Sequence, residues 1–127
     1  MKYLTSQDIL VMHKHIIDAT SGAHGIRDIG LLISIEERPK MTFSGEELYS
    51  GVFLKASVYL DSIIRYHVFI DGNKRTAFAS TVRFLYQNGY KFTAGNREVE
   101  EFVLKVTVEE LDLSKISAWI KKYSKKM

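Results

Sequence analysis

The chain has 127 residues, no cysteine and a formal net charge of +3 at pH 7. Apolar residues make up 46% of it and charged residues 26%, which is ordinary globular composition and predicts a single domain, residues 1–127, with one hydrophobic core. The absence of cysteine excludes disulfides, thiolate metal sites and thiol nucleophiles. No apolar run reaches ~18 residues and the N-terminal segment lacks an apolar signal core, so we expect no membrane span and a cytoplasmic location.

Two helices are expected ahead of the single proline. The first is capped by Thr5 or Ser6 and ends in the glycine-containing loop of residues 20–25. The second covers about residues 27–35 and ends before the proline, because the residue preceding a proline is driven out of the helical conformation. Residues 36–43 include a stretch that can extend, so we expect a small β-hairpin there.

The middle of the chain predicts two long helices separated by a loop. The sequence SGEE at residues 44–47 has the pattern of a capping box, which would open a helix that runs to about Tyr66. A new helix should start near Asn73 and run to Asn88, where Gly89 follows as a stop signal. The apolar positions of the first helix cover a wide face, so we expect it to be central in the fold.

Two further helices should follow a short extended stretch at residues 90–95. One covers residues 97–108, and the other is capped by Ser114. The lysines near the C-terminus suit a helix dipole and are interpreted as a solvated helix end, not as a nucleic-acid site: Lys121, Lys122, Lys125 and Lys126. The whole pattern predicts an all-α domain of about five to seven helices.

Residues 67–75 read HVFIDGNKR and combine several groups that phosphate chemistry needs. Imidazoles titrate near neutral pH, so His67, at the end of a helix, can take a proton from an attacking hydroxyl. Asp71 suits a hard cation such as Mg²⁺ that bridges protein and phosphate groups. Phe69 and one apolar neighbour should plug the loop into the core and fix its shape. Phosphoryl transfer uses such parts because its enzymes mainly position groups and neutralise charge.

A new helix begins directly after this loop, and helix N-termini bind anions through their free N–H groups and their dipole. Gly72 lets a phosphate approach the backbone because it has no Cβ. Asn73 can donate or accept hydrogen bonds there, while Lys74 adds a point charge and Arg75 a planar fork that matches phosphate oxygens. Each of these residues taken alone is more often structural or solvated, but together they predict a phosphate-binding loop.

The stretch HVFIDGNKRTA resembles the motif of the Fic/Doc family, H-x-F-x-D/E-G/A-N-x-R. All fixed positions of the motif are met: His67, Phe69, Asp71, Gly72, Asn73 and Arg75. Three other segments resemble Doc-type proteins in the same order: residues 25–32, 43–57 and 84–90. The resemblance covers most of the chain and implies a Fic-fold helical bundle with a small β-hairpin flap near residues 36–43. In that family the flap holds an extended piece of the target protein by strand addition, and residues 38–43 are the matching stretch.

Lys74 stands where the AMP-transferring enzymes of that family have glycine. The resemblance therefore favours the Doc (death-on-curing) toxins, protein kinases that transfer the γ-phosphate of ATP. It also implies that the acceptor is a threonine of elongation factor Tu and that the outcome is arrest of translation. The inhibitory pattern S/T-x-x-x-E-G/N of self-inhibited members is missing, because Glu47 stands where its last residue is required. This implies control by a separate antitoxin of the Phd type.

The resemblance also implies a role for each motif residue. His67 would be the general base and Arg75 would neutralise the developing charge, so these two are the expected catalytic residues. Asp71 would hold Mg²⁺ or orient the acceptor. The phosphates of ATP would be bound by four consecutive residues: Gly72, Asn73, Lys74 and Arg75.

Two alternatives stay open at this point. One is a Fic-type AMP or other nucleotidyl-transferase that acts on a protein hydroxyl, although the glycine expected at position 74 is missing. The other is a non-catalytic binding module, against which the intact motif argues. His13, His15 and His24 lack the spacing of zinc ligands and are interpreted as structural or solvated. The sequence does not identify the target, the antitoxin or the oligomeric state.

Overall fold

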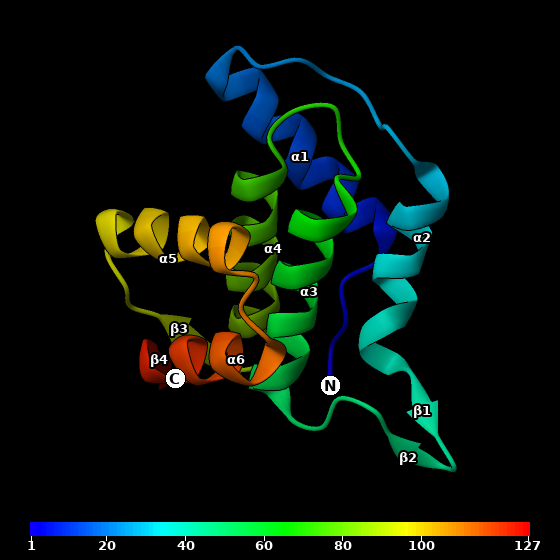
Figure 1. Cartoon of the computed structure of the whole chain (residues 1–127), viewed down its shortest axis with the longest axis vertical. Helices are drawn as coiled ribbons and strands as arrows, with labels where there is room; N and C mark the ends of the chain where they lie inside the picture. The colour runs from blue at the N-terminus through cyan, green and yellow to red at the C-terminus, as the bar shows by residue number, and fades with distance from the viewer.

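The computed structural model describes all 127 residues and is predominantly helical (Figure 1). Its helices are α1 (Ser6–Thr20), α2 (Ile29–Glu37), the 3₁₀ helix η1 (Arg38–Lys40), α3 (Val52–Tyr66), α4 (Asn73–Gln87), α5 (Asn96–Glu109) and α6 (Leu113–Lys122). Its strands are β1 (Thr42–Phe43), β2 (Glu46–Glu47), β3 (Tyr90–Phe92) and β4 (Ser124–Lys126). The expected all-α fold is confirmed, and none of the helices combines the length and hydropathy that crossing a membrane requires.

Helices α3 and α4 form the centre of the bundle (Figure 1). Helix α1 packs on α4 and α2 on α3, while α5 and α6 lie on the other side. Every residue of α3 from Lys55 to Ile64 is buried, which confirms that this helix is central. Tyr59 of α3 and Phe84 of α4 join the two helices, with ring centroids 4.9 Å apart. Helices α3 and α4, which flank the loop of residues 67–72, are therefore the two helices with the most buried residues.

Helix α1 begins as the sequence predicts. Thr5 is its N-cap, and Thr5 and Asp8 bond each other's backbone N–H groups in a capping box. The preceding residue, Leu4, is buried and donates its N–H to the hydroxyl of Tyr59 at 3.0 Å. Three residues one turn apart form the buried face of α1, namely Ile9, His13 and Ile17. This face presents His13 to the interior.

The expected helix cap at residues 44–47 is wrong. Ser44 and Gly45 have φ angles of 53° and 81°, and they form the two-residue turn of a hairpin that pairs β1 with β2. Two successive left-handed residues match the right-handed twist of a two-stranded ribbon, which explains why this turn is favoured. Helix α3 starts only at Val52, after Gly51. The spacing from Ser44 to Glu47 therefore matches the capping-box pattern without forming a helix cap.

The small hairpin is present, but it lies at residues 42–47 and not at 36–43. Residues 36–37 end α2 and residues 38–40 form η1, which tolerates Pro39 in its first turn because a missing N–H costs nothing there. The buried ammonium of Lys55 ties the hairpin to α3, since it donates to the Pro39 carbonyl at 2.9 Å and pairs with Glu47 at 3.1 Å. The hairpin is therefore anchored at the N-terminal end of α3.

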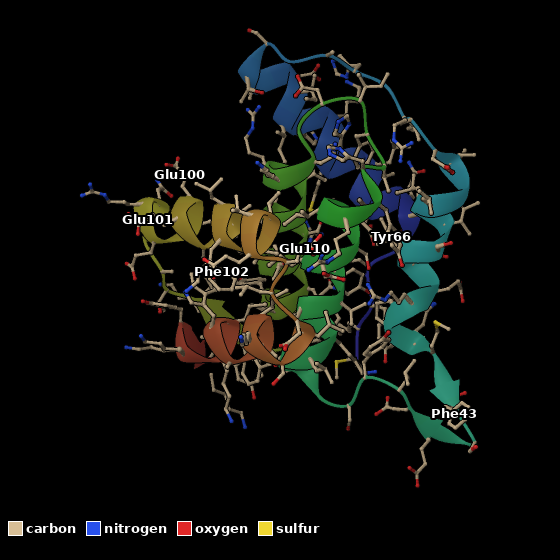
Figure 2. The ribbon with its side chains drawn as sticks, in the orientation of Figure 1. Phe43, Tyr66, Glu100, Glu101, Phe102 and Glu110 are labelled. Atoms are coloured by element: carbon tan, nitrogen blue, oxygen red, sulfur yellow. The ribbon has the colours of Figure 1, made fainter.

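This anchoring separates the hairpin from the motif loop. His67 follows the other end of α3, twelve residues after Lys55 (67 − 55), which is ~18 Å along a helix. Figure 2 shows Phe43 at the hairpin and Tyr66 away from it, at the other end of α3. The expectation that residues 38–43 hold a target protein beside the motif is therefore wrong.

The C-terminal segment also departs from expectation. Lys121 and Lys122 end α6 as predicted, but Lys125 and Lys126 belong to β4, which pairs antiparallel with β3. The N-cap of α6 is Asp112, whose carboxylate accepts the N–H of Lys115 at 2.9 Å, and not Ser114. Strands β3 and β4 are far apart in the sequence, so the short polar segment that forms β4 carries no local pattern that would predict the pairing.

The buried contact between Leu4 and Tyr59 gives a test of this packing. Tyr59→Phe should lower the free energy of unfolding by about 1–3 kcal/mol, because the buried N–H of Leu4 loses its acceptor. Urea denaturation measures the change. Tyr86→Phe is the matched control, since Tyr86 is 63% exposed and its substitution should change stability by less than about 0.5 kcal/mol. Equal stability of Tyr59→Phe and the wild type would contradict this packing.

Candidate active site

The motif loop, residues 67–72, joins α3 to α4 at one end of the bundle (Figure 1). His67 ends α3 in the left-handed conformation, with φ 49° and ψ 52°, and its side chain is exposed. Val68 and Phe69 are 0% and 1% exposed and plug the loop into the core, as predicted. Gly72, with φ 77°, turns the chain into α4. The loop thus leaves one central helix and enters the other, with its imidazole toward solvent.

The side chain of Asn73 is enclosed by the loop. Its Oδ1 accepts the N–H of Phe69 at 3.0 Å, and its Nδ2 donates to the Phe69 carbonyl at 2.8 Å. These two bonds fix which end of the amide is which, so the Nδ2 group 3.2 Å from His67 Nδ1 is a donor. Asn73 therefore shapes the loop and orients the imidazole, and it presents only its backbone N–H to a phosphate.

The first turn of α4 is an open anion site. The N–H groups of Asn73, Lys74 and Arg75 have no acceptor, because the first backbone bond of the helix runs from Thr76 to Gly72 at 3.0 Å. A helix N-terminus also carries a partial positive charge. The turn faces a cavity of about 270 Å³, which is lined by His67, Ile70, Asp71, Gly72, Asn73, Lys74 and Arg75. All of the expected site residues therefore meet at one cavity.

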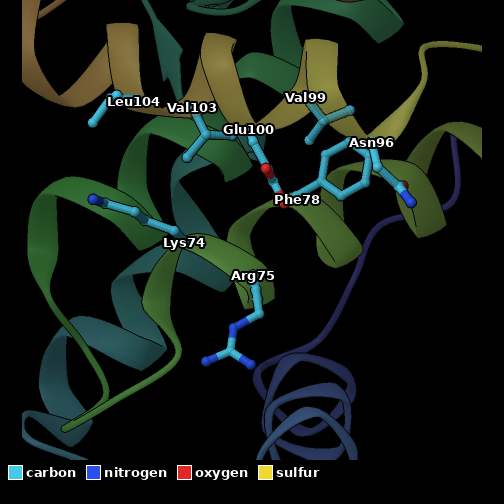
Figure 3. A pocket seen from close by; sticks show the side chains of 8 residues that line it. All are labelled: Lys74, Arg75, Phe78, Asn96, Val99, Glu100, Val103 and Leu104. Atoms are coloured by element: carbon cyan, nitrogen blue, oxygen red, sulfur yellow. The ribbon is translucent and has the colours of Figure 1, made fainter. Parts of the chain in front are cut away.

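A larger cavity of about 480 Å³ continues from this site between α4 and α5 (Figure 3). Lys74 and Arg75 line both cavities, and in Figure 3 their side chains diverge from the start of α4. Its walls are mainly apolar and include Phe78 and Val103, while Glu100 and Asn96 add polar groups. A ligand with phosphates at the helix N-terminus could place an apolar ring system in this space.

Asp71 is held by backbone N–H groups on both sides. Its Oδ2 accepts the N–H of Ala23 at 3.1 Å and its Oδ1 that of Gly72 at 2.8 Å. These two donors lower the pKa of Asp71 below its ordinary value, and the charge of Arg75 adds to the effect. A Cβ on Gly22 would lie 2.7 Å from Oδ2, so glycine is needed there for close approach.

A divalent cation at Asp71 would depend on the substrate for its other ligands. No group of three or more His, Cys, Asp or Glu side chains is arranged to hold a metal ion. Asp71 is ionised at neutral pH and each of its oxygens keeps a free lone pair, because each accepts one hydrogen bond. One carboxylate together with phosphate oxygens and waters is a usual environment for Mg²⁺. The residues present therefore fit the expected ion only together with a phosphate ligand.

His13 is a part of the site that sequence reasoning missed. The interpretation of His13 as a structural residue is confirmed, because its side chain is buried at 3% exposure directly beneath the loop, but its contact with the motif was not predicted. Its ring stacks on Phe69, with centroids 3.7 Å apart and planes 6° from parallel, and its Nε2 lies 2.8 Å from the carbonyl oxygen of Asp71. The available signal was its position four residues from both Ile9 and Ile17, on the apolar face of α1.

A second missed element is the segment of residues 22–28, which lies beside the motif loop. Arg27 donates its N–H to the Val68 carbonyl at 2.7 Å, and Ile70 donates to Gly25 at 3.1 Å. Ile26 is thereby paired antiparallel with Phe69 in an isolated β-bridge. The N–H and carbonyl of Ile26 make no backbone hydrogen bond, so the other edge of the segment is free. A groove of about 460 Å³ between this segment and α1 adjoins that edge.

Asp71→Asn tests whether its carboxylate fastens the loop. The lowered pKa means that ionised Asp71 stabilises the folded state above the ordinary carboxyl pKa, and that this stabilisation is lost as the pH falls through the lowered pKa. Wild type should therefore be more stable than Asp71→Asn near neutral pH, and the difference should shrink toward about pH 2. Urea denaturation across this range measures it, with the exposed Glu109→Gln as a control that should show no such change. A difference that stays constant with pH would contradict this role.

Comparison with known proteins agrees with this geometry. The model of the Fic/DOC family matches residues 3–85. The chain is 34% identical over 119 residues to a protein named Toxin Doc from Mycolicibacterium smegmatis, an alignment that covers 92% of this chain and 89% of that protein. It is 26% identical over 117 residues to a protein named Protein kinase doc from Escherichia phage P1, with 92% and 91% covered.

The family match and the site coincide. Residues 3–85 include α1, the segment of residues 22–28, the motif loop and most of α4, which are the elements that build the cavity around His67. With the family model covering more than half of the chain, and a relative of similar length more than 30% identical, this protein belongs to the Fic/Doc family, and its likeness is to the Doc toxins within it.

Proposed function

We propose that this protein is a Doc-type toxin that transfers the γ-phosphate of ATP to a hydroxyl of a target protein. The observation that carries the proposal is the cavity in which His67, Asp71 and the free N–H groups of the first turn of α4 converge. The names of the two relatives, one a toxin and one a protein kinase, support the same reading. The acceptor proposed from the resemblance is a threonine of elongation factor Tu, so that translation stops.

The transfer can be written with the groups present. The oxygen of the acceptor hydroxyl attacks the γ-phosphorus and forms a new O–P bond, while the bond from that phosphorus to the β–γ bridging oxygen breaks. ADP leaves with the bonding electron pair. The hydroxyl proton passes to the imidazole of His67, and Arg75 balances the charge that gathers on the transferred group. The N–H groups of Asn73, Lys74 and Arg75 hold the phosphates in place.

The proton has a defined destination on the imidazole. Asn73 Nδ2 donates toward Nδ1, so the neutral ring that keeps this contact carries its proton on Nε2. To accept the hydroxyl proton at Nε2, the ring must carry its own proton on Nδ1, and the 3.2 Å contact with Asn73 Nδ2 then opens. Asn73 therefore orients the ring before the reaction, and the loop shaped by its two bonds to Phe69 keeps the backbone of His67 in place during it. In a loose transition state the proton leaves late, so orientation of the hydroxyl matters as much as basicity.

Lys74 supports γ-phosphate transfer in preference to AMP transfer. Its side chain starts at the second residue of α4 and borders both cavities, where a glycine would leave an open slot. An ammonium in that position fills part of the slot and attracts the more highly charged end of a nucleoside triphosphate. Mg²⁺ held by Asp71 and the phosphates would neutralise further charge when bound. The cavity between α4 and α5 has room for the rest of the nucleotide.

The target is proposed to bind at the free edge of residues 24–27. The hairpin of residues 42–47 lies at the far end of α3, whereas Ile26 is bridged to Phe69 within the motif loop itself. An extended target segment that pairs with the unused N–H and carbonyl of Ile26 would lie directly beside His67. A separate antitoxin, which the resemblance implies to be of the Phd type, is proposed to block the toxin until it is needed.

Label transfer from ATP tests the proposed reaction. Incubation with elongation factor Tu and ATP labelled on the γ-phosphate should label the factor, whereas ATP labelled on the α-phosphate should not, because only the terminal group moves. His67→Ala should slow the transfer by about 10²–10⁴-fold. His15→Ala is the matched control, since His15 is exposed on α1 and lines no cavity of the site, and it should react like the wild type. Labelling from the α-phosphate alone would replace the proposal by AMP transfer.

A further inference from the structure

The side chain of Arg27 closes the C-terminal end of α3. Its Nε donates to the carbonyl of His67 at 2.5 Å, and its Nη2 donates to the carbonyl of Tyr66 at 2.6 Å. The last carbonyls of a helix have no partner within the helix, so the two bonds satisfy groups that would otherwise depend on water. Tyr66 marks this end of α3 in Figure 2. One planar guanidinium therefore bonds the last residue of α3, Tyr66, and the first residue of the motif loop, His67.

These hydrogen bonds act at a residue whose backbone is in the left-handed conformation. His67 has a φ angle of 49°, and a residue other than glycine holds such a left-handed conformation only when its surroundings fix it. The direction of the imidazole follows from this backbone turn. Arg27 bonds the carbonyl of His67 itself, and its own N–H bonds the next carbonyl, that of Val68, at 2.7 Å. Three successive carbonyls are thus held by one residue.

Arg27 is itself held in place by the neighbouring helix. Asp28 also donates its N–H to the Val68 carbonyl, at 3.3 Å, and its carboxylate caps α2 by accepting the N–H of Leu31 at 3.0 Å. The start of α2 therefore fixes the backbone position from which the Arg27 side chain extends to α3. Arg27 lines neither of the two cavities beside Lys74 and Arg75, so its side chain has no contact with the space proposed for the nucleotide.

We propose that Arg27 is a positioning residue for the transfer reaction: it clamps the carbonyls of Tyr66 and His67 and thereby keeps the imidazole facing the phosphate cavity. The inference rests on the proposed function for its kinetic part only. The role requires the fork of an arginine, because a lysine ammonium is a single point charge that matches two carbonyls less well. A loss of the clamp should lower the rate of the chemical step and leave ATP binding intact.

The test uses the whole 127-residue chain and three variants of it. Arg27→Met keeps an unbranched apolar stem and removes both bonds, while Arg27→Lys keeps the charge. Arg97→Met is the matched control, since Arg97 is 93% exposed on α5 and pairs only with Glu101. Each protein is assayed for kcat and KM with γ-labelled ATP. The side-chain amide protons of Asn73 are followed by NMR, because Asn73 Nδ2 contacts the His67 ring and reports its position.

Arg27→Met should lower kcat by about 10- to 100-fold and change KM for ATP by less than about twofold. Arg27→Lys should recover part of the lost kcat, and Arg97→Met should match the wild type. The Asn73 amide signals should shift in Arg27→Met and stay in place in Arg97→Met. A purely structural arginine would lower the melting temperature without moving these signals or kcat in the folded protein.

Three results would overturn the inference. The first is a folded Arg27→Met with the kcat and Asn73 signals of the wild type. The second is a rise in KM for ATP that accounts for the whole loss, which would place Arg27 on the nucleotide. The third applies if Arg27→Met does not fold: a folded Arg27→Lys with full kcat would then assign the residue to stability alone. If the wild type transfers no γ-label, the proposed function fails, and the Asn73 signals in Arg27→Met still decide the positioning role.

Discussion

The site depends on one buried amide, the side chain of Asn73. It bonds both the N–H and the carbonyl of Phe69, four residues earlier, and thereby closes the motif loop on itself. The same amide reaches the His67 ring, so the shape of the loop and the direction of the imidazole have a common origin. These bonds occupy the side chain of Asn73. A phosphate at this site would therefore be bound by the backbone N–H groups at the start of α4. Backbone donors on a rigid helix need no reorganisation when charge develops, which suits phosphoryl transfer.

Residues of α1 and of the segment 22–28, which are distant in sequence, contact this motif loop. His13 of α1 stacks beneath Phe69, Ala23 bonds the carboxylate of Asp71, and Arg27 grips the end of α3. Each contact reaches a different part of the loop, so the loop is braced by α1 and by residues 22–28 before any ligand arrives. The hairpin of residues 42–47 takes no part in this bracing, since Lys55 fastens it to the other end of α3. The motif loop and the hairpin are therefore held at opposite ends of α3.

The motif could be predicted from the sequence because its parts are contiguous. A turn glycine, a helix start and their charged neighbours are local features, and the same holds for the Thr5 cap of α1. The failures involve contacts that local patterns do not encode. Residues 44–47 satisfy the spacing of a helix cap and also the two left-handed residues of a hairpin turn, and tertiary anchoring at Lys55 favours the hairpin. His13 and Arg27 were missed because their partners lie 58 and 40 residues away. The expected roles of the six site residues stay predictions, although all six line one cavity.

Asn73→Leu tests the central claim most directly, because leucine has nearly the same shape and none of the three hydrogen bonds. The two backbone groups of Phe69 would be left buried without partners, which should lower the free energy of unfolding by about 2–4 kcal/mol. In protein that circular dichroism shows to be folded, γ-phosphate transfer should fall by about 100-fold, since the imidazole is no longer held against the phosphate site. A folded Asn73→Leu variant that transfers phosphate at the rate of the wild type would show that the amide does not set the geometry of the site.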